Sequence, residues 1–141
     1  MTTYESNVKT ISSTEEVVFN ILGDIKNLEK VRSFAENSGK VKDLQLDTDS
    51  CSFTVEPVGK VGFSIAERIP FQTIRLVTDQ SPFAVELRFS LNRINDAETG
   101  MKLTLNADIP MMIKMMVDKK LKEGIEQIAE MLAMAMNNNI L

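Results

Sequence analysis

The chain has 141 residues, 43% of them hydrophobic, and a net charge of −4 from 16 basic and 20 acidic side chains. This composition is typical of a globular protein, so it excludes a disordered chain and indicates a single domain over residues 1–141. Because the charges are interspersed without a basic patch, no nucleic-acid partner is expected.

The sequence also excludes several kinds of site. Its apolar runs fall far short of the roughly 20 residues that cross a bilayer, and its first residues lack the layout of a signal peptide. Cys51 is the only cysteine and there is no histidine, which argues against a disulfide, a zinc site and a Ser-His or Cys-His nucleophile. We therefore expect a cytoplasmic protein without a metal or other cofactor.

The first elements are a strand and two short helices. Residues from Thr3 to Ile11 are rich in strand-forming side chains and predict a first strand. Ser13, followed three residues later by Glu16, has the spacing of a capping box that begins a helix. Asp24, after the Gly23 break, is expected to cap a second short helix.

From about residue 41 the apolar residues recur every second position. Six short segments show this alternation, and a turn is expected at Pro57. Strands with one apolar and one polar face are typical of an antiparallel meander. The segments are residues near 41, 51–56, 61–69, 74–78, 83–92 and 101–109.

A long helix is predicted to close the chain. Pro110 suits its first turn because proline has no amide hydrogen to donate, and the pattern continues to about Ala135. Charged residues that we expect on its solvent side are Lys119, Lys122, Glu123, Glu126 and Glu130. The apolar stripe expected to face the sheet consists of Ile113, Val117, Leu121, Gly124, Ile128, Met131 and Ala135.

This order of elements predicts an α+β fold. A first strand, two helices, six strands and a last helix can form a curved antiparallel sheet of about seven strands around the long C-terminal helix. A bent sheet that holds one helix can leave space between them, and such spaces bind small apolar ligands.

The element order, with the segments STEEVVFNILGDIKNLEKV and ERIPFQTIRL, resembles the START-like helix-grip superfamily, or SRPBCC-like proteins, and within it the polyketide cyclase/dehydrase-type branch. The resemblance covers about Thr3 to Ala135. Many relatives carry a tryptophan near the first two helices, where this chain has only Phe19 and Phe34. The resemblance implies a hydrophobic cavity for lipids, sterols, polyketides or similar molecules.

We therefore predict binding or carriage of a hydrophobic small molecule in a cavity between the sheet and the C-terminal helix. One alternative is a cyclase- or dehydratase-type enzyme that uses carboxylate or tyrosine acid–base groups. Another is a protein-interaction module with a filled interior. The residues expected to line the cavity are Phe53, Val55, Phe63, Ile65, Leu76, Val85, Leu87, Phe89, Leu103, Leu105, Met112, Met116, Val117 and Gly124.

Glu67 and Tyr4 are the candidates for catalysis. Strict alternation places Glu67 on the face of Phe63 and Ile65, where burial would raise its pKa and suit acid–base chemistry. If the strand bulges or ends there, Glu67 instead forms an ion pair at the rim. Tyr4, the only tyrosine, has either a ligand-binding or a packing role.

The methionine cluster, which we define as Met111, Met112, Met115 and Met116, begins the last helix. It can serve as core filler, as a lip over the cavity mouth or as a homodimer contact. Gly124 lies on the predicted inner stripe, so either the sheet or a ligand is expected to come close there. Cys51 shares the parity of Phe53, which favours a buried, unreactive thiol.

Overall fold

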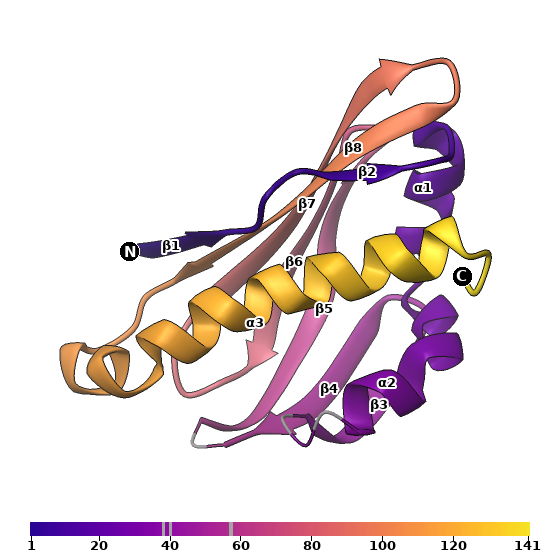
Figure 1. Cartoon of the computed structure of the whole chain (residues 1–141). Helices are drawn as coiled ribbons and strands as arrows, with labels where there is room; N and C mark the ends of the chain where they lie inside the picture. The colour runs from indigo at the N-terminus through magenta and orange to yellow at the C-terminus, as the bar shows by residue number, and fades with distance from the viewer. Residues whose placement is uncertain (38, 40, 57) are drawn as a thin grey trace.

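The computed structural model describes residues 1–37, 39, 41–56 and 58–141, so the turn predicted at Pro57 lies outside the described residues. It shows the predicted α+β architecture, with helices on one side of an antiparallel sheet (Figure 1). In chain order the elements are β1 (Thr2–Glu5), β2 (Lys9–Ile11), α1 (Glu15–Leu22), the 3-10 helix η1 (Ile25–Val31), α2 (Arg32–Asn37), β3 (Lys42–Leu46), β4 (Ser50–Val55), β5 (Gly59–Ile69), β6 (Thr73–Gln80), β7 (Val85–Asn95), β8 (Glu98–Ala107) and α3 (Met111–Asn137).

The six strands predicted after residue 41 form the expected meander. The sheet order is β1-β8-β7-β6-β5-β4-β3, and β2 also pairs with β8. The first strand therefore returns to pair with the last one. The prediction of a curved antiparallel sheet beside a long C-terminal helix is confirmed.

The first strand predicted from Thr3 to Ile11 is interrupted: β1 and β2 both pair with β8, and the chain leaves the ladder between them. At this break the Ser6 amide donates to the Leu103 carbonyl at 2.9 Å. The Leu103 amide in turn donates to Ser6 Oγ, also at 2.9 Å. The Ser6 hydroxyl thus replaces a backbone acceptor, and the next amide, that of Asn7, is free to turn toward α3.

The N-cap of α1 is Thr14 rather than the predicted Ser13. Thr14 Oγ1 accepts a hydrogen bond of 3.3 Å from the Val17 amide. Ser13 is committed elsewhere, because its carbonyl accepts a 2.8 Å hydrogen bond from the hydroxyl of Thr99, which is fully buried on β8. The cap is set by the attachment of the preceding residue to the sheet, and both side chains satisfy the local sequence rule.

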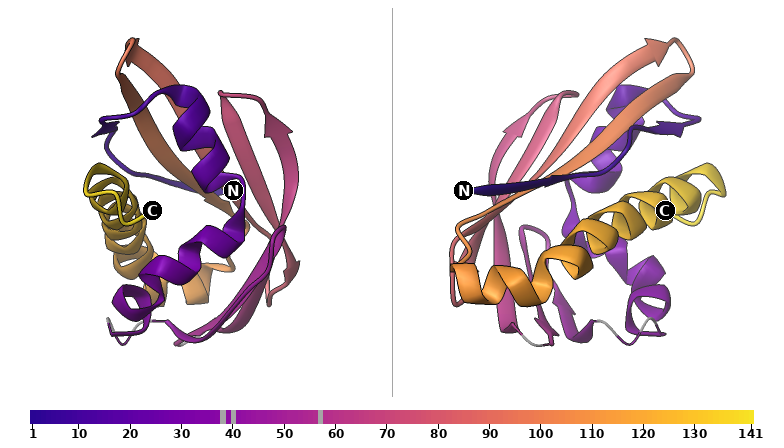
Figure 2. Two further views of the ribbon diagram at one scale, coloured as in Figure 1. Left: turned by 90° about the vertical axis from the view of Figure 1, so that its right-hand side faces the viewer. Right: turned by 60° about the vertical axis from the view of Figure 1, so that its left-hand side comes forward.

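Asp24 caps the second helical segment, as predicted. Its carboxylate accepts a 3.0 Å hydrogen bond from the Lys26 amide. The segment begins as η1 and continues directly into α2. Together with α1 these short helices lie on the same side of the sheet as α3 (Figure 2).

The long helix α3 crosses the concave side of the sheet and lies closest to β8, β2 and β1 (Figure 1). The predicted inner stripe is confirmed in part, because Val117 and Ala135 are buried. Ile128, expected inside, is 42% exposed. A second buried stripe, about a quarter-turn away, consists of Ile125, Ala129, Leu132 and Met136.

Candidate functional site

The concave face of the sheet is apolar from β8 across to β4. Cross-strand pairing aligns its residues in rows, because side chains directly opposite each other in an antiparallel sheet share a face. The rows are Tyr4–Leu105–Leu87–Leu76–Ile65, Leu103–Phe89–Ile74 and, at the far strands, Phe63–Cys51 and Val61–Phe53. Eight of the ten strand residues predicted to line a cavity belong to these rows, and the other two, Val55 and Val85, lie two positions from Phe53 and Leu87 on the same strands.

Burial divides these ten residues into two groups. Phe63, Leu76, Val85, Leu103 and Leu105 are buried in the core. The other five keep part of their apolar surface accessible, although they face inward. These half-buried residues are Phe53, Val55, Ile65, Leu87 and Phe89.

One apolar flank of α3 has open space at Gly124. A Cβ atom placed on Gly124 would meet no heavy atom within 4 Å, so the sheet does not approach this position. Ile128 is exposed, and Met131, on the same flank, is half-buried. Val117, predicted for the cavity, is buried in the same helix.

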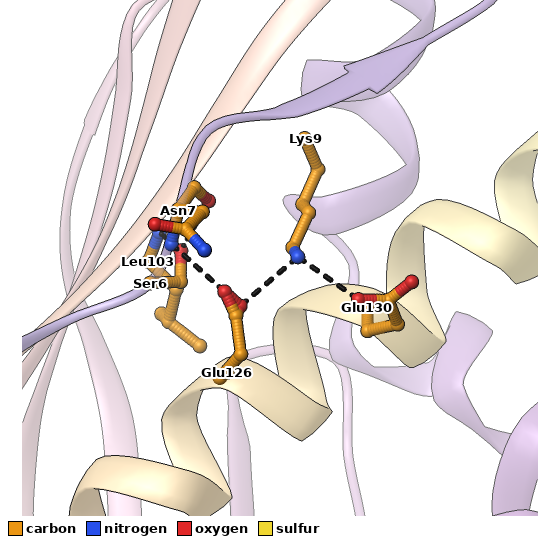
Figure 3. A network of polar contacts seen from close by, with 6 residues as sticks. All are labelled: Ser6, Asn7, Lys9, Leu103, Glu126 and Glu130. Carbon is orange, nitrogen blue, oxygen red and sulfur yellow. Dashed lines mark hydrogen bonds and ion pairs between the residues drawn. The ribbon is translucent and has the colours of Figure 1, made fainter.

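The opposite flank of α3 is bound to the N-terminal strands by polar contacts (Figure 3). The Asn7 amide donates to Glu126 Oε1 at 3.0 Å. Lys9 Nζ lies 2.9 Å from Glu126 Oε2 and 2.9 Å from Glu130 Oε2. The Asn7 hydrogen bond and then the Lys9 ammonium lower the pKa of Glu126, and the two carboxylates raise the pKa of Lys9.

This polar seam, formed by Tyr4–Ser12 with Asp118–Asn137, extends along the helix. Near its start the Tyr4 hydroxyl donates to Asp118 Oδ1 at 2.5 Å. At its end Asn137 accepts from the Ser12 amide at 2.8 Å and donates to the Thr10 carbonyl at 3.0 Å.

Glu130 is exposed, as predicted, whereas Glu126, also expected on the solvent side, is half-buried against the N-terminal strands. The i, i+4 spacing of these two carboxylates puts them on one helix face. Lys9 is a basic residue in a predicted strand. A lysine in the strand and two carboxylates on one helix face were therefore the available sequence signal for a contact between strand and helix.

Glu67 does not enter the interior. Ile65 pairs with Leu76, whereas Glu67 pairs with Arg75, so Ala66 is an extra residue in β5. This β-bulge moves Glu67 to the convex face, where it is 48% exposed and lies 3.7 Å from Arg75. Of the two readings of Glu67, the structure shows the bulged strand with a rim ion pair.

Tyr4 points from β1 toward α3 and is buried, in contact with the core. Burial, with the hydrogen bond and negative charge of Asp118, raises its pKa to about 12. The hydroxyl therefore stays protonated at neutral pH and already has an acceptor. This arrangement is that of a packing and anchoring residue.

Cys51 lies on the concave face beside Phe63, in the position predicted for it. Burial, with a smaller contribution from the charge of Asp79, raises the pKa of its thiol to about 11. The thiol is therefore protonated at neutral pH and a weak nucleophile.

The methionine cluster is exposed on the outer side of α3. The exposed fractions are 72% for Met111, 81% for Met112, 80% for Met115 and 63% for Met116. Met112 and Met116 were expected to line the cavity, and this placement corrects that expectation. Because Val117 takes the buried position in these turns, its helical neighbours on the opposite arc face solvent. The exposures also argue against a role as core filler.

Two pockets are found away from the concave face. One, of about 430 Å³, is lined by residues of α2 and β3, including Arg32, Glu36 and Lys42. The other, of about 300 Å³, lies along the second half of α3 beside Glu130, Met131 and Met134. In the described part of the chain, no three His, Cys, Asp or Glu residues are grouped as metal ligands. None of the described helices has the length and apolar character that a membrane crossing requires.

No protein-family model and no curated protein matches the sequence. Solved structures do match over nearly the whole chain. A START superfamily protein from Mycobacterium smegmatis is 15% identical, with 89% of this chain and 98% of that chain covered and a TM-score of 0.56. An Aha1 dimer from Colwellia psychrerythraea, solved in solution, is 15% identical, with 97% of both chains covered and a TM-score of 0.65. A conserved protein from Geobacillus kaustophilus is 17% identical, with 99% of this chain and 95% of that chain covered and a TM-score of 0.62. The chain therefore has the START-like, SRPBCC-type helix-grip fold.

Proposed function

We propose that this protein binds or carries a hydrophobic small molecule, such as a lipid, a sterol or a polyketide-like compound, in the cytoplasm. The ligand would lie between the concave face of the sheet and the free flank of α3. The observation that carries the proposal is a set of inward-facing but half-buried apolar residues, among them Phe53, Leu87 and Phe89, in a fold whose helix leaves Gly124 uncontacted.

The physical basis is the removal of apolar surface from water. Each Å² so removed contributes about 25 cal/mol, and the half-buried side chains keep such surface available. Polar groups on the same face are already satisfied, since Thr78 Oγ1 accepts from the Val85 amide at 3.2 Å and Tyr4 donates to Asp118. A ligand body without charge fits this face best, because a charge buried there would lack a partner.

No observation favours the alternative of a polyketide cyclase- or dehydratase-type enzyme. Glu67 lies on the convex face, and the pKa of Tyr4 is too high for proton transfer near neutral pH. A protein-interaction module with a filled interior is the other alternative, and it predicts that no small molecule binds.

Native mass spectrometry of freshly purified protein, followed by titration with an environment-sensitive apolar dye, tests the proposal. We expect saturable binding of one dye per chain, displaced by sterols or long-chain lipids. Leu87→Gln should weaken dye binding about tenfold or more, because Leu87 faces inward. Arg88→Gln is the matched control. Arg88 is the next residue of β7 and lies on the convex face, so its substitution should leave dye binding unchanged. Absence of saturable binding by folded protein across these ligands would support the filled interior.

We also propose that two copies associate through the methionine cluster. Four exposed apolar side chains in two helical turns favour a contact surface, and the Aha1 structure with the same fold is a dimer. Sedimentation velocity should show a dimer that Met112→Lys with Met115→Lys converts to a monomer. A wild-type protein that sediments as a monomer at all concentrations would contradict this assembly.

A further inference from the structure

Four of the nine methionines lie in the first two turns of α3, and none of the four is packed in the core. Their side chains are unbranched, flexible thioethers held on a regular helix. From this arrangement we infer that the methionine cluster is a binding site for a soft monovalent cation, Cu(I), with Ag(I) as its redox-inert equivalent. The inference needs only one chain and does not rest on the proposed hydrophobic ligand.

The helical spacing brings the thioethers together. Met111 and Met115 are four residues apart, as are Met112 and Met116, and Met112 and Met115 are three apart. Residues at these spacings are neighbours on a helix, with Cβ atoms about 5–6 Å apart. With about 3.6 residues per turn, all four fall on one continuous arc opposite the buried Val117. Two or three sulfur atoms can therefore converge on one ion without a change in the backbone.

The donor set selects for a soft ion. Thioether sulfur is a neutral, polarisable ligand that prefers Cu(I), whereas Zn²⁺ requires imidazole or thiolate and Mg²⁺ or Ca²⁺ requires oxygen ligands. The chain has no histidine. Of the nearest carboxylates, Asp118 is engaged by the Tyr4 hydroxyl. The cluster therefore offers sulfur and little else.

The local charge sharpens this selectivity. The start of a helix carries a partial positive charge, and Lys114, Lys119 and Lys120 are in the same segment. These charges oppose any cation that is held by electrostatic attraction alone, such as Na⁺ or Mg²⁺. Bonds between Cu(I) and thioether sulfur are largely covalent, so they tolerate a cationic surrounding far better.

Substitution of methionine by leucine distinguishes a metal site from a hydrophobic contact surface. Leucine has nearly the volume and apolar character of methionine but has no ligand atom. Replacing all four methionines of the cluster by leucine should therefore preserve any apolar association and abolish metal binding. Substitution by lysine, used above for the dimer, removes both.

The experiment uses the full chain with Cys51→Ala in every variant, because a free thiol also binds Ag(I). Isothermal titration with Ag(I), and anaerobic competition for Cu(I) against a chromophoric chelator, should show one ion per chain. The methyl ¹³C resonances of the four cluster methionines should shift on binding, while those of Met101 and Met136 in the core stay in place. Zn²⁺ and Mg²⁺ should produce no shift.

The four-leucine variant should lose affinity for Ag(I) by about a hundredfold or more. Met131→Leu with Met134→Leu, on the same helix but outside the cluster, is the matched control and should bind normally. Should the four-leucine variant unfold by circular dichroism, the milder pair Met111→Leu with Met115→Leu replaces it, with a loss of at least about tenfold expected. Failure of the parent to bind Ag(I), or equal binding by the parent and the leucine variants, would overturn the inference.

Discussion

The hydroxyl of Tyr4 donates a 2.5 Å hydrogen bond to the carboxylate of Asp118, which joins β1 to the first half of α3. With the Asn137 contacts at the other end of the helix, it marks one limit of the polar seam. The seam binds a single flank of α3. The flank with Gly124 and Ile128 is apolar, and the helix lies closest to β8, β2 and β1 at one edge of the sheet.

The Tyr4–Asp118 pair predicts an unusual titration. The chain has one tyrosine and no tryptophan, so near-ultraviolet phenolate absorbance reports Tyr4 alone. We expect it to titrate near a pKa of about 12, above its ordinary value of 10.0. The pKa of Tyr4 is higher in the folded than in the unfolded chain, so the protonated hydroxyl stabilises the fold. This contribution to the free energy of unfolding is complete below about pH 10 and is lost as the pH rises toward 12.

Asp118→Asn provides the control for this titration. It removes the negative charge and keeps the burial, so the pKa of Tyr4 should fall but remain above its ordinary value, since burial is the largest cause of the shift. A wild-type titration near the ordinary value would mean that the Tyr4 hydroxyl is not held by Asp118.

The centre of the seam predicts a loss of stability in acid. The pKa of Glu126 is lowered below 4.5 by the Asn7 amide and Lys9, so its stabilisation is present above that pH and is lost as the pH falls through the folded pKa. Glu126→Gln should melt below wild type at neutral pH and lose less further stability in acid. Glu123→Gln, an exposed helical neighbour, should keep the wild-type profile. Parallel melting curves for wild type and Glu126→Gln at every pH would contradict this role.

The sequence was most informative for the strands. Alternation of apolar and polar residues is a local property, and it correctly predicted six strands and the faces of residues such as Phe63 and Leu87. It failed where one extra residue shifts the alternation, at Ala66 before Glu67 and at Ser6 between β1 and β2. Such bulges depend on the partner strand, which no local pattern reports.

The rotation of α3 illustrates a second limit. Its sequence offers two apolar arcs, one through Gly124 and Ile128 and the other through Ile125 and Leu132. In the structure the second arc is buried, and Lys9 contacts Glu126 and Glu130 on the adjacent face of the helix. That contact spans more than a hundred residues, so the helix pattern alone could not decide between the arcs, nor could it place the methionine cluster.

In the turn between β5 and β6, we expect glycine at position 71 to give a more stable protein than alanine. The Gln72 amide donates to the Ile69 carbonyl at 3.0 Å, and Phe71 adopts a φ of 65°, which favours glycine. Phe71 stays there because its ring packs edge-on against Phe19, with centroids 5.8 Å apart. The strain costs about 1–2 kcal/mol, and the ring contact contributes about 0.5–1.5 kcal/mol.

Phe71→Ala loses the ring and keeps the strain, whereas Phe71→Gly loses the ring and relieves it. We therefore expect the glycine variant to melt above the alanine variant, against the usual order for the two residues. Chemical denaturation gives the free energies of unfolding. An alanine variant as stable as the glycine variant would show that the left-handed conformation at Phe71 is not maintained in solution.

Gly124 tests whether space exists beneath the free flank of α3. Glycine within a helix costs up to about 1 kcal/mol relative to alanine, and a Cβ at Gly124 meets nothing within 4 Å. Gly124→Ala should therefore raise the melting temperature and leave dye affinity nearly unchanged. Gly124→Leu should also hold or raise the melting temperature, but its longer side chain should occupy the proposed ligand space and weaken dye binding. In a packed interior the leucine would instead overpack and cost about 1–3 kcal/mol. A Gly124→Leu variant that melts well below Gly124→Ala, from a parent that binds no dye, would mean that the sheet and helix enclose a filled core.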